Sequence, residues 1–265
     1  MDAGALFEWI SFSLTSGIGV LSLNRPPVNA LNRVMVGEIS RWLDRAGDEI
    51  ANHNLRVVVL RAEGKHFCAG ADLKERRNVP EEKVELLVSS IRETFRKLAE
   101  LPVPVIAAVH GAAMGGGLEL ALAADFRILS EGAQVGLPET SLAILPGAGG
   151  TQRLGRLIGY SRAFFWIAAA RKFSAKEALH YGVANWVVPR KDLLPTAMNL
   201  AEEIARNGPV AVQSAKQALQ KGLEVPLKEA LNVEKFFYAK TIYTQDRLEG
   251  IKAFLEKRMP RYKGE

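Results

Sequence analysis

Residues 103–124 have the sequence VPVIAAVHGAAMGGGLELALAA. The continuous apolar run Val103–Val109 is typical of a strand that is covered on both faces. A glycine-rich turn follows at Gly111–Gly117, and a helix is expected from about Gly116 to Ala124. A buried strand that leads through a turn into a helix favours an α/β fold.

A similar unit occupies the first sixty residues. Alternating apolar residues predict strands at Trp9–Leu14 and Ile18–Leu23, joined by a turn. Asn32 is a candidate N-cap for a helix with apolar residues at helical spacing. The apolar run Leu55–Leu60 then predicts another strand covered on both faces. Further short strands are expected at 126–129 and 184–188.

After Pro189 the pattern predicts helices only. The sequence Asn207-Gly208-Pro209 places glycine past the end of one helix and proline at the start of the next. Helices are expected at about 195–206, 210–221, 227–241 and 246–257. Because no Ser/Gly/Pro-rich linker precedes them, we expect these helices to pack on the core or on another subunit.

The composition excludes several classes of protein. The chain has 265 residues, of which 48% are hydrophobic and 24% charged, as in ordinary soluble globular proteins. A single cysteine, Cys68, excludes a disulfide framework, and the four histidines lack metal-ligand spacing, so no metal is expected. No apolar stretch approaches the roughly 20 residues that span a bilayer. Met1–Gly4 does not begin a secretion signal, so a cytoplasmic protein without a membrane partner is expected.

The net charge of +6 and the pI of about 9.4 suggest an anionic partner. The excess lies in residues 151–200, which sum to +6, and in the last fifteen residues, which sum to +3. No run of Lys or Arg exceeds two residues, and no aromatic residues interleave with them. The evidence for an RNA groove is therefore weak, and a small polyanionic ligand fits the charge equally well.

Three glycine-rich turns are candidate binding elements. Their sequences are FCAGADL (67–73), GAAMGGGLE (111–119) and LPGAGGT (145–151). None has the phosphate-loop or dinucleotide-binding pattern. Backbone N–H groups from two such turns that converge on one oxygen would form an oxyanion hole, and the second turn leads into a helix N-terminus that favours negative charge. The alternative is that these glycines only permit tight turns.

Two glutamates lie beside these turns among apolar neighbours. Glu119 is in the first turn of the helix that follows Gly115–Gly117, and Glu139 is in a short extended segment before the third turn. Such surroundings raise carboxyl pKa values and suit proton transfer. The alternatives are a dipole-favoured glutamate at a helix N-terminus and a capping glutamate.

Taken together, the order and spacing of these motifs resemble the crotonase (enoyl-CoA hydratase/isomerase) superfamily. The resemblance runs from Leu23-Asn24-Arg25-Pro26 and Asn29-Ala30-Leu31 to Glu256-Lys257-Arg258. Residues 118–123, 246–250 and 260–265 look most like the AU-binding methylglutaconyl-CoA hydratases, which also bind RNA. The resemblance implies a spiral of ββα units in residues 1–194 and a helical oligomerisation region in residues 195–265, which would build a homotrimer or a dimer of trimers.

The resemblance also implies a chemical role for each motif. The N–H groups of Ala71 and Gly116 would hold the thioester oxygen of a trans-2-enoyl-CoA. Glu119 would orient a water molecule and Glu139 would deliver a proton to the α-carbon, so that water adds syn. Because isomerases of this type generally keep one carboxylate, a hydratase of fatty-acid or branched-chain amino-acid degradation is favoured. The alternatives are a methylglutaconyl-CoA hydratase with an RNA-binding side activity and an enoyl-CoA isomerase.

Coenzyme A, which is part of the substrate, would be the anionic partner, and no separate cofactor is implied. Lys74, and Lys257 from a neighbouring subunit, are candidate contacts to its phosphates. Arg76 and Arg77 could meet a carboxylate on the acyl group, or they could be a solvated charge pair. The acyl chain length stays open because Leu118 and Leu137 depart from the residues common in hydratases. The other implied substrate-binding residues are Ala69, Gly70, Asp72, Leu73, Gly115, Pro138, Leu145 and Gly147.

Overall fold

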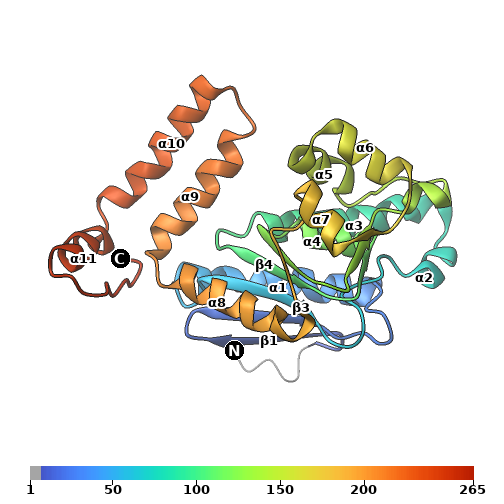
Figure 1. Ribbon diagram of the computed structural model, residues 1–265, viewed down its shortest axis with the longest axis horizontal. Helices are drawn as coiled ribbons and strands as arrows, with labels where there is room; N and C mark the ends of the chain where they lie inside the picture. Colours follow the sequence, from blue (N-terminus) through green and yellow to red (C-terminus); the bar gives the residue numbers. More distant parts are fainter. Residues whose placement is uncertain (1–6) are drawn as a thin grey trace.

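A six-stranded sheet lies at the centre of the computed structural model, which describes residues 7–265 (Figure 1). Its strand order is β1-β2-β3-β4-β6-β9, and only the β1–β2 pair is antiparallel. The strands are β1 (Ile10–Thr15), β2 (Ile18–Leu23), β3 (Val57–Ala62), β4 (Val105–Val109), β6 (Phe126–Ser130) and β9 (Trp186–Val188). All six match predicted strands to within a few residues, which confirms the α/β class. Met1–Gly4, considered above for a secretion signal, lies outside the described residues.

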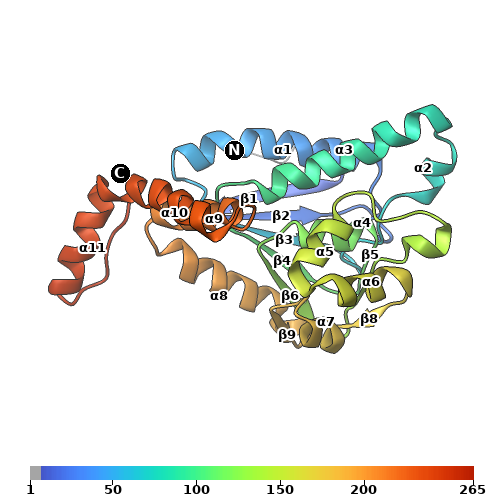
Figure 2. The same cartoon turned by 90° about the horizontal axis from the view of Figure 1, so that it is seen from above.

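Both faces of this sheet are covered, as the continuous apolar strands predicted. Successive residues of a strand point to opposite faces. Val57 and Val59 of β3 therefore pack with helix α8 (Leu193–Ala205), whereas Val58 and Leu60 pack with the large core on the other face. Figure 2 shows α1 (Arg33–Ala51) and α3 (Glu81–Ala99) on one side of the sheet and α8 on the other.

Helix α1 begins where the sequence predicted. The side chain of Asn32 accepts a hydrogen bond from the N–H of Met35, which confirms it as the N-cap. The apolar face of the helix, which includes Val36 and Ile39, is buried in the core. The register of α1 is thus set by its cap and by its apolar stripe.

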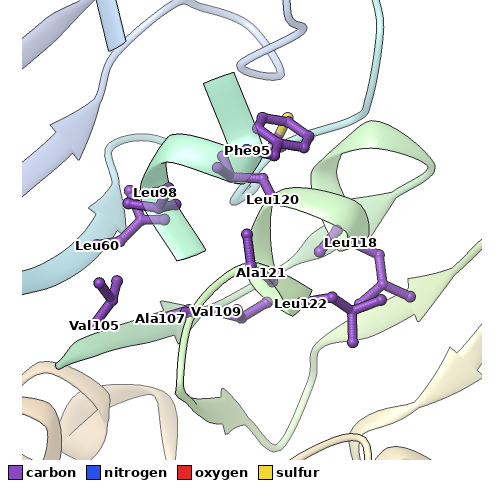
Figure 3. Packing of buried hydrophobic residues seen from close by; sticks show 14 of the residues in the cluster. Leu60, Phe95, Leu98, Val105, Ala107, Val109, Leu118, Leu120, Ala121 and Leu122 are labelled. Carbon is purple, nitrogen blue, oxygen red and sulfur yellow. The ribbon is translucent and has the colours of Figure 1, made fainter. Parts of the chain in front are cut away.

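A second, three-stranded sheet was not predicted. It pairs β5 (Ala112–Met114) in parallel with β7 (Gln134–Gly136), and β7 in antiparallel with β8 (Phe173–Ser174). Helix α4 (Gly116–Leu122) follows β5 almost directly and is buried along its whole length. Figure 3 shows Leu120 and Ala121 of α4 packed among side chains of α3 and β4.

Short helices lie in the connections between the strands and before α8. They are α2 (Leu73–Arg77), η1 (Glu139–Leu142), α5 (Gly150–Ile158), α6 (Tyr160–Ala168), α7 (Ala175–Tyr181) and η2 (Arg190–Asp192).

The C-terminal helices project from the core as an arm (Figures 1 and 2). This arm, which we call the helical arm, consists of α9 (Pro209–Gly222), α10 (Leu227–Ile242) and α11 (Gln245–Leu255). The predicted boundary at residue 194 lies inside α8, which packs on the sheet. Lys216 of α9 ties the arm to the core, because its Nζ donates to Val103 O (2.9 Å) and to Asp125 Oδ2 (2.7 Å).

Downstream of Pro189, the described residues contain helices and no strand, as predicted. Across residues 7–265, the helices are all too short or too polar to cross a membrane.

Candidate active site

The turn after β3 lies beside strand β5. Cys68 N–H donates to Ala112 O (3.0 Å) and Met114 N–H donates to Cys68 O (3.0 Å), which places residues 67–71 against 112–116. A Cβ atom on Gly117 would lie 2.1 Å from Cys68 O, so only glycine permits this approach. The two glycine-rich turns that the sequence singled out are thus adjacent.

The N–H groups of Ala71 and Gly116 are close together and unused. Leu31 forms hydrogen bonds with the two residues that flank Ala71: its N–H donates to Gly70 O and its carbonyl accepts from Asp72 N–H, both at 2.8 Å. In this pairing the Ala71 amide points away from Leu31. A Cβ on Gly116 would lie 3.5 Å from Ala71 N, and one on Gly70 would lie 3.3 Å from Gly116 N. Neither N–H has an acceptor within residues 7–265. Two unpaired donors that face one small space can bind one oxygen.

Glu119 lies on α4 and is 3% exposed. Its Oε1 accepts hydrogen bonds from Ala148 N–H and Gly150 N–H, both 2.8 Å, which fixes the carboxylate against the third glycine-rich turn. Burial raises the pKa of Glu119, although the two amide donors and the positive charges of Arg92 and Arg153 oppose that rise. Glu119 is therefore a clamped carboxylate, with Oε2 left for another partner.

Glu139 begins the 3-10 helix η1, and it has a different environment. Its Oε1 lies 2.8 Å from the position of a Cβ on Gly115, beside the start of α4, and its buried Oε2 has no hydrogen-bond partner within residues 7–265. Burial raises the pKa of Glu139 to about 7, and the nearby charge of Glu119 adds to the rise. The same residue type thus exists in two states here: one clamped by amides, the other poised to hold a proton near neutral pH.

Glu119, Glu139, Ala71 and Gly116 all line one cavity of about 170 Å³. The cavity is lined by residues of α2, α3, α4 and η1 and of the turn before α5, and α2 lies at the opposite end of the molecule from the helical arm (Figure 2). Its remaining wall is mostly apolar, and within residues 7–265 Arg76 is the only cation that lines it. The lining residues that the sequence predicted as site residues are Ala69, Gly70, Ala71, Leu73, Gly115, Gly116, Glu119, Pro138, Glu139, Leu145 and Gly147.

Four predicted substrate-binding residues do not line this cavity. Leu137 is completely buried in the hydrophobic core. Asp72 is turned to its own helix, where its Oδ1 accepts from Lys74 N–H and Glu75 N–H as the N-cap of α2. Lys74 is exposed on α2, and Lys257 lies past the end of α11 on the distant arm. Arg77, the neighbour of Arg76, is also exposed and outside the cavity.

Several lining residues were missed by the sequence analysis. Helix α3 contributes Val88 and Ile91, and the amphipathic pattern of residues 81–99 is the signal that could have found them. The others, Met114, Leu142, Ile144 and Ala148, carry no local signal of function. Leu142 and Leu145 are large apolar side chains that are more than half exposed at the cavity.

A family model and curated relatives match nearly the whole chain. The family model described as enoyl-CoA hydratase/isomerase matches residues 13–265. The mitochondrial methylglutaconyl-CoA hydratase of Homo sapiens is 46% identical over 255 residues, which are 94% of this chain and 74% of that protein.

Solved structures show the same likeness. The crystal structure of an enoyl-CoA hydratase from Bacillus anthracis has a TM-score of 0.94 and 49% identity, covering 97% of this chain and 100% of that one. An enoyl-CoA hydratase structure from Mycobacterium smegmatis has a TM-score of 0.90 at 30% identity, covering 96% and 99%.

Proposed function

This chain belongs to the enoyl-CoA hydratase/isomerase (crotonase) family, and we propose that its reaction is the syn addition of water to a trans-2-enoyl-CoA. One observation carries the proposal: two carboxylates line the same cavity as two residues with unpaired backbone amides. The carboxylate of Glu119 accepts two backbone hydrogen bonds, whereas Oε2 of Glu139 has no partner within residues 7–265. Addition of water needs a group that accepts a proton from water and a group that donates one to carbon. A double-bond isomerisation needs only one such group.

The amides of Ala71 and Gly116 would hold the thioester oxygen. As water attacks the β-carbon, negative charge moves through the α-carbon onto that oxygen, where fixed N–H donors stabilise it. Removing one such donor typically costs about 10² to 10³ in rate. The apolar wall excludes competing water and strengthens these interactions.

The two glutamates would handle the protons. Because Ala148 and Gly150 both bind Oε1 of Glu119, Oε2 is left to accept a proton from the attacking water. Glu139, whose pKa of about 7 keeps much of it protonated at neutral pH, would give its proton to the α-carbon. The oxygen of water bonds to the β-carbon, and a proton passes back from Glu119 to Glu139 before the next turnover.

The test is hydration of crotonyl-CoA, followed by loss of the absorbance of the conjugated enoyl thioester. Glu119→Gln and Glu139→Gln should each lower kcat by about 10² to 10⁴, the usual contribution of a general acid or base. Glu131→Gln, an exposed glutamate outside the cavity, is the matched control and should keep wild-type kcat. Absence of turnover by the wild type, or full activity of Glu139→Gln, would reject the proposal. Conversion of a 3-enoyl-CoA to the 2-enoyl isomer without hydration would indicate the isomerase instead.

A second candidate is hydration of an enoyl-CoA with a carboxylate on its acyl group, as in methylglutaconyl-CoA. Arg76 supports it, since its half-buried side chain is the cation at the cavity wall. Arg76→Gln should then raise KM for methylglutaconyl-CoA at least tenfold and leave KM for crotonyl-CoA unchanged, with the exposed Arg77→Gln as control. Equal effects on both substrates would exclude this role. An RNA-binding side activity would require binding that survives physiological salt, because non-specific contacts weaken steeply with salt.

We also propose assembly through the helical arm into a trimer or a dimer of trimers. The arm exposes large apolar side chains, among them Leu223 and Phe254, which are more than four-fifths exposed in the single chain. Lys257 lies on the same arm and could reach a cavity only in another subunit. Light scattering should give a mass about three or six times 29.0 kDa, and a monomer mass would contradict the assembly. We also propose a cytoplasmic location, with which the free thiol of the single cysteine, Cys68, is compatible.

A further inference from the structure

The segment Arg25–Leu31 lies along the turn that carries Ala71, and the proposed reaction makes no use of it. Ala69 N–H donates to Val28 O (3.0 Å), Leu31 N–H donates to Gly70 O, and Asp72 N–H donates to Leu31 O (both 2.8 Å). Arg25–Leu31 therefore binds the turn on both sides of Ala71. The side chain of Leu31 also reaches the second turn, because its Cδ1 lies 3.1 Å from the position of a Cβ on Gly116.

Asn29 holds the beginning of the same turn. Its side chain is buried, and its Nδ2 donates to Glu63 O (2.9 Å) and to His66 O (2.8 Å). Its Oδ1 accepts from Arg25 N–H at 2.6 Å. Its φ of 52° is in the left-handed region, which asparagine tolerates better than most residues. One side chain thus satisfies three backbone groups and connects Arg25 to the start of the turn.

Arg25 holds the end of the turn. Its Nη1 donates to Ala30 O and its Nη2 donates to Asp72 Oδ2, both at 2.8 Å. The partner, Asp72, directly follows Ala71 and also caps α2 through Oδ1. The contact with Arg25 lowers the pKa of the Asp72 carboxyl, so the pair is charged at neutral pH. Asp72 therefore joins Arg25, Ala71 and α2 in one rigid unit.

We propose that Arg25 is a positioning residue of the thioester site: while Asn29 holds the start of the turn, the contact of Arg25 with Asp72 sets the direction of the Ala71 N–H relative to the Gly116 N–H. This inference rests on the proposed function in one respect, that a thioester oxygen binds between these two amides. The amides come from different segments, so their convergence depends on what fixes each segment. The Gly116 amide is fixed by β5 and α4, whereas the Ala71 amide belongs to an irregular turn that Arg25, Asn29 and Leu31 hold in place.

The variants are chosen to loosen this hold without breaking the fold. Arg25→Gln removes both guanidinium bonds, and Asp72→Asn removes the charge of the partner while an asparagine still caps α2. We expect Arg25→Gln to lower kcat by about 10- to 100-fold with little change in KM, since misplacement by about 1 Å can cost 10² in rate. Asp72→Asn should give a smaller loss in the same direction. The double variant should lose no more activity than Arg25→Gln alone, because both changes break the same contact, the one between Arg25 and Asp72.

Arg33→Gln is the matched control. Arg33 also pairs with a carboxylate of α2, Glu75, at 2.9 Å, but the pair is more exposed and neither residue lines the cavity. It should keep wild-type kcat. Thermal unfolding of each variant separates misplacement from loss of fold, and Asp72→Asn carries the test if Arg25→Gln does not fold.

The readout specific to positioning is the absorbance of a bound chromophoric thioester, 4-(dimethylamino)cinnamoyl-CoA. Hydrogen bonds to its carbonyl oxygen draw electrons along the conjugated chain and shift the band to longer wavelength. The wild type should show this red shift, and Arg25→Gln and Asp72→Asn should reduce it in the folded, saturated protein. A wild-type shift and wild-type kcat in both variants would overturn the inference. Absence of hydration by a wild type that still shows the shift would instead reject only the proposed function.

Discussion

Gly150, which has no side chain, is predicted to control the activity of Glu119. It begins α5, and its N–H is one of the two donors to Glu119 Oε1. A Cβ at this position would lie 2.9 Å from Glu119 Oε1, 3.1 Å from Glu119 Cγ and 2.8 Å from Pro146 Cβ. Because non-bonded atoms at rest are about 3.5 to 4.0 Å apart, Gly150→Ala must displace the Glu119 carboxylate or the turn by roughly half an ångström.

The expected effect on activity follows from that displacement. If a misplacement of about 1 Å costs about 10² in rate, a displacement of roughly half an ångström should lower kcat by roughly tenfold. Stability should change less, since alanine gains up to about 1 kcal/mol in a helix over glycine while overpacking costs about 1 to 3 kcal/mol. Gly150→Ala should therefore fold, melt near or a few degrees below the wild type, and hydrate crotonyl-CoA slowly.

Gly155→Ala in the same helix is the control. A Cβ on Gly155 would meet nothing within 4 Å, so this variant should gain up to about 1 kcal/mol of stability and keep wild-type kcat. The assay is steady-state hydration of crotonyl-CoA beside thermal unfolding for both variants. Equal, wild-type kcat in both would refute the reasoning that the turn at residues 148–150 positions Glu119.

Three further predictions concern stability. Folding raises the pKa of Glu139 from 4.5 to about 7, so the folded state holds an extra proton between these values and the free energy of unfolding falls as pH rises through that window. Glu139→Gln should remove this dependence and raise Tm at pH 8, and an unchanged pH profile of Tm would contradict the raised pKa. Gly117→Ala should abolish folding or lower Tm by many degrees, because its Cβ would overlap Cys68 O, and a soluble variant with wild-type Tm would disprove that approach. Asp246→Ala should loosen the C-terminal tail, because the N–H groups of Lys263 and Gly264 donate to Asp246 at 2.8 and 2.7 Å. Limited proteolysis should then cleave the tail sooner than in the wild type. Equal cleavage rates would argue against this contact.

The main sheet could be predicted because its strands are buried on both faces. The apolar runs at 55–60 and 103–109 carry that signal locally, and the cap at Asn32 marks the start of α1 in the same way. The second sheet could not be predicted, since its strands are two or three residues long and β5 lies inside a glycine-rich turn. Strand β5 forms because the turn after β3 lies on one side of it and strand β7 on the other.

The candidate site was partly predictable for a related reason. Glycines at strand ends and glutamates among apolar residues are local features, and they singled out Glu119, Glu139 and the turns that carry Ala71 and Gly116. The family resemblance then pointed to the amides of those two residues. The clamp on Glu119 and the contribution of α3 depend on segments that meet only in the folded chain. Asp72 could not be assigned from its position in the motif, because one carboxylate oxygen caps α2 and the other accepts from Arg25, which is 47 residues away in sequence.

Hydration of crotonyl-CoA in ²H₂O tests the central claim most directly, because it reports on both carboxylates at once. A carboxyl that donates to the α-carbon beside a carboxylate that binds water should place one deuterium at C2 and the hydroxyl at C3 on the same face of the former double bond. Analysis of the 3-hydroxyacyl-CoA product by NMR should show this syn product, at a rate that Glu119→Gln and Glu139→Gln each reduce by about 10² or more. Addition of water to opposite faces, or migration of the double bond with no water added, would contradict the account.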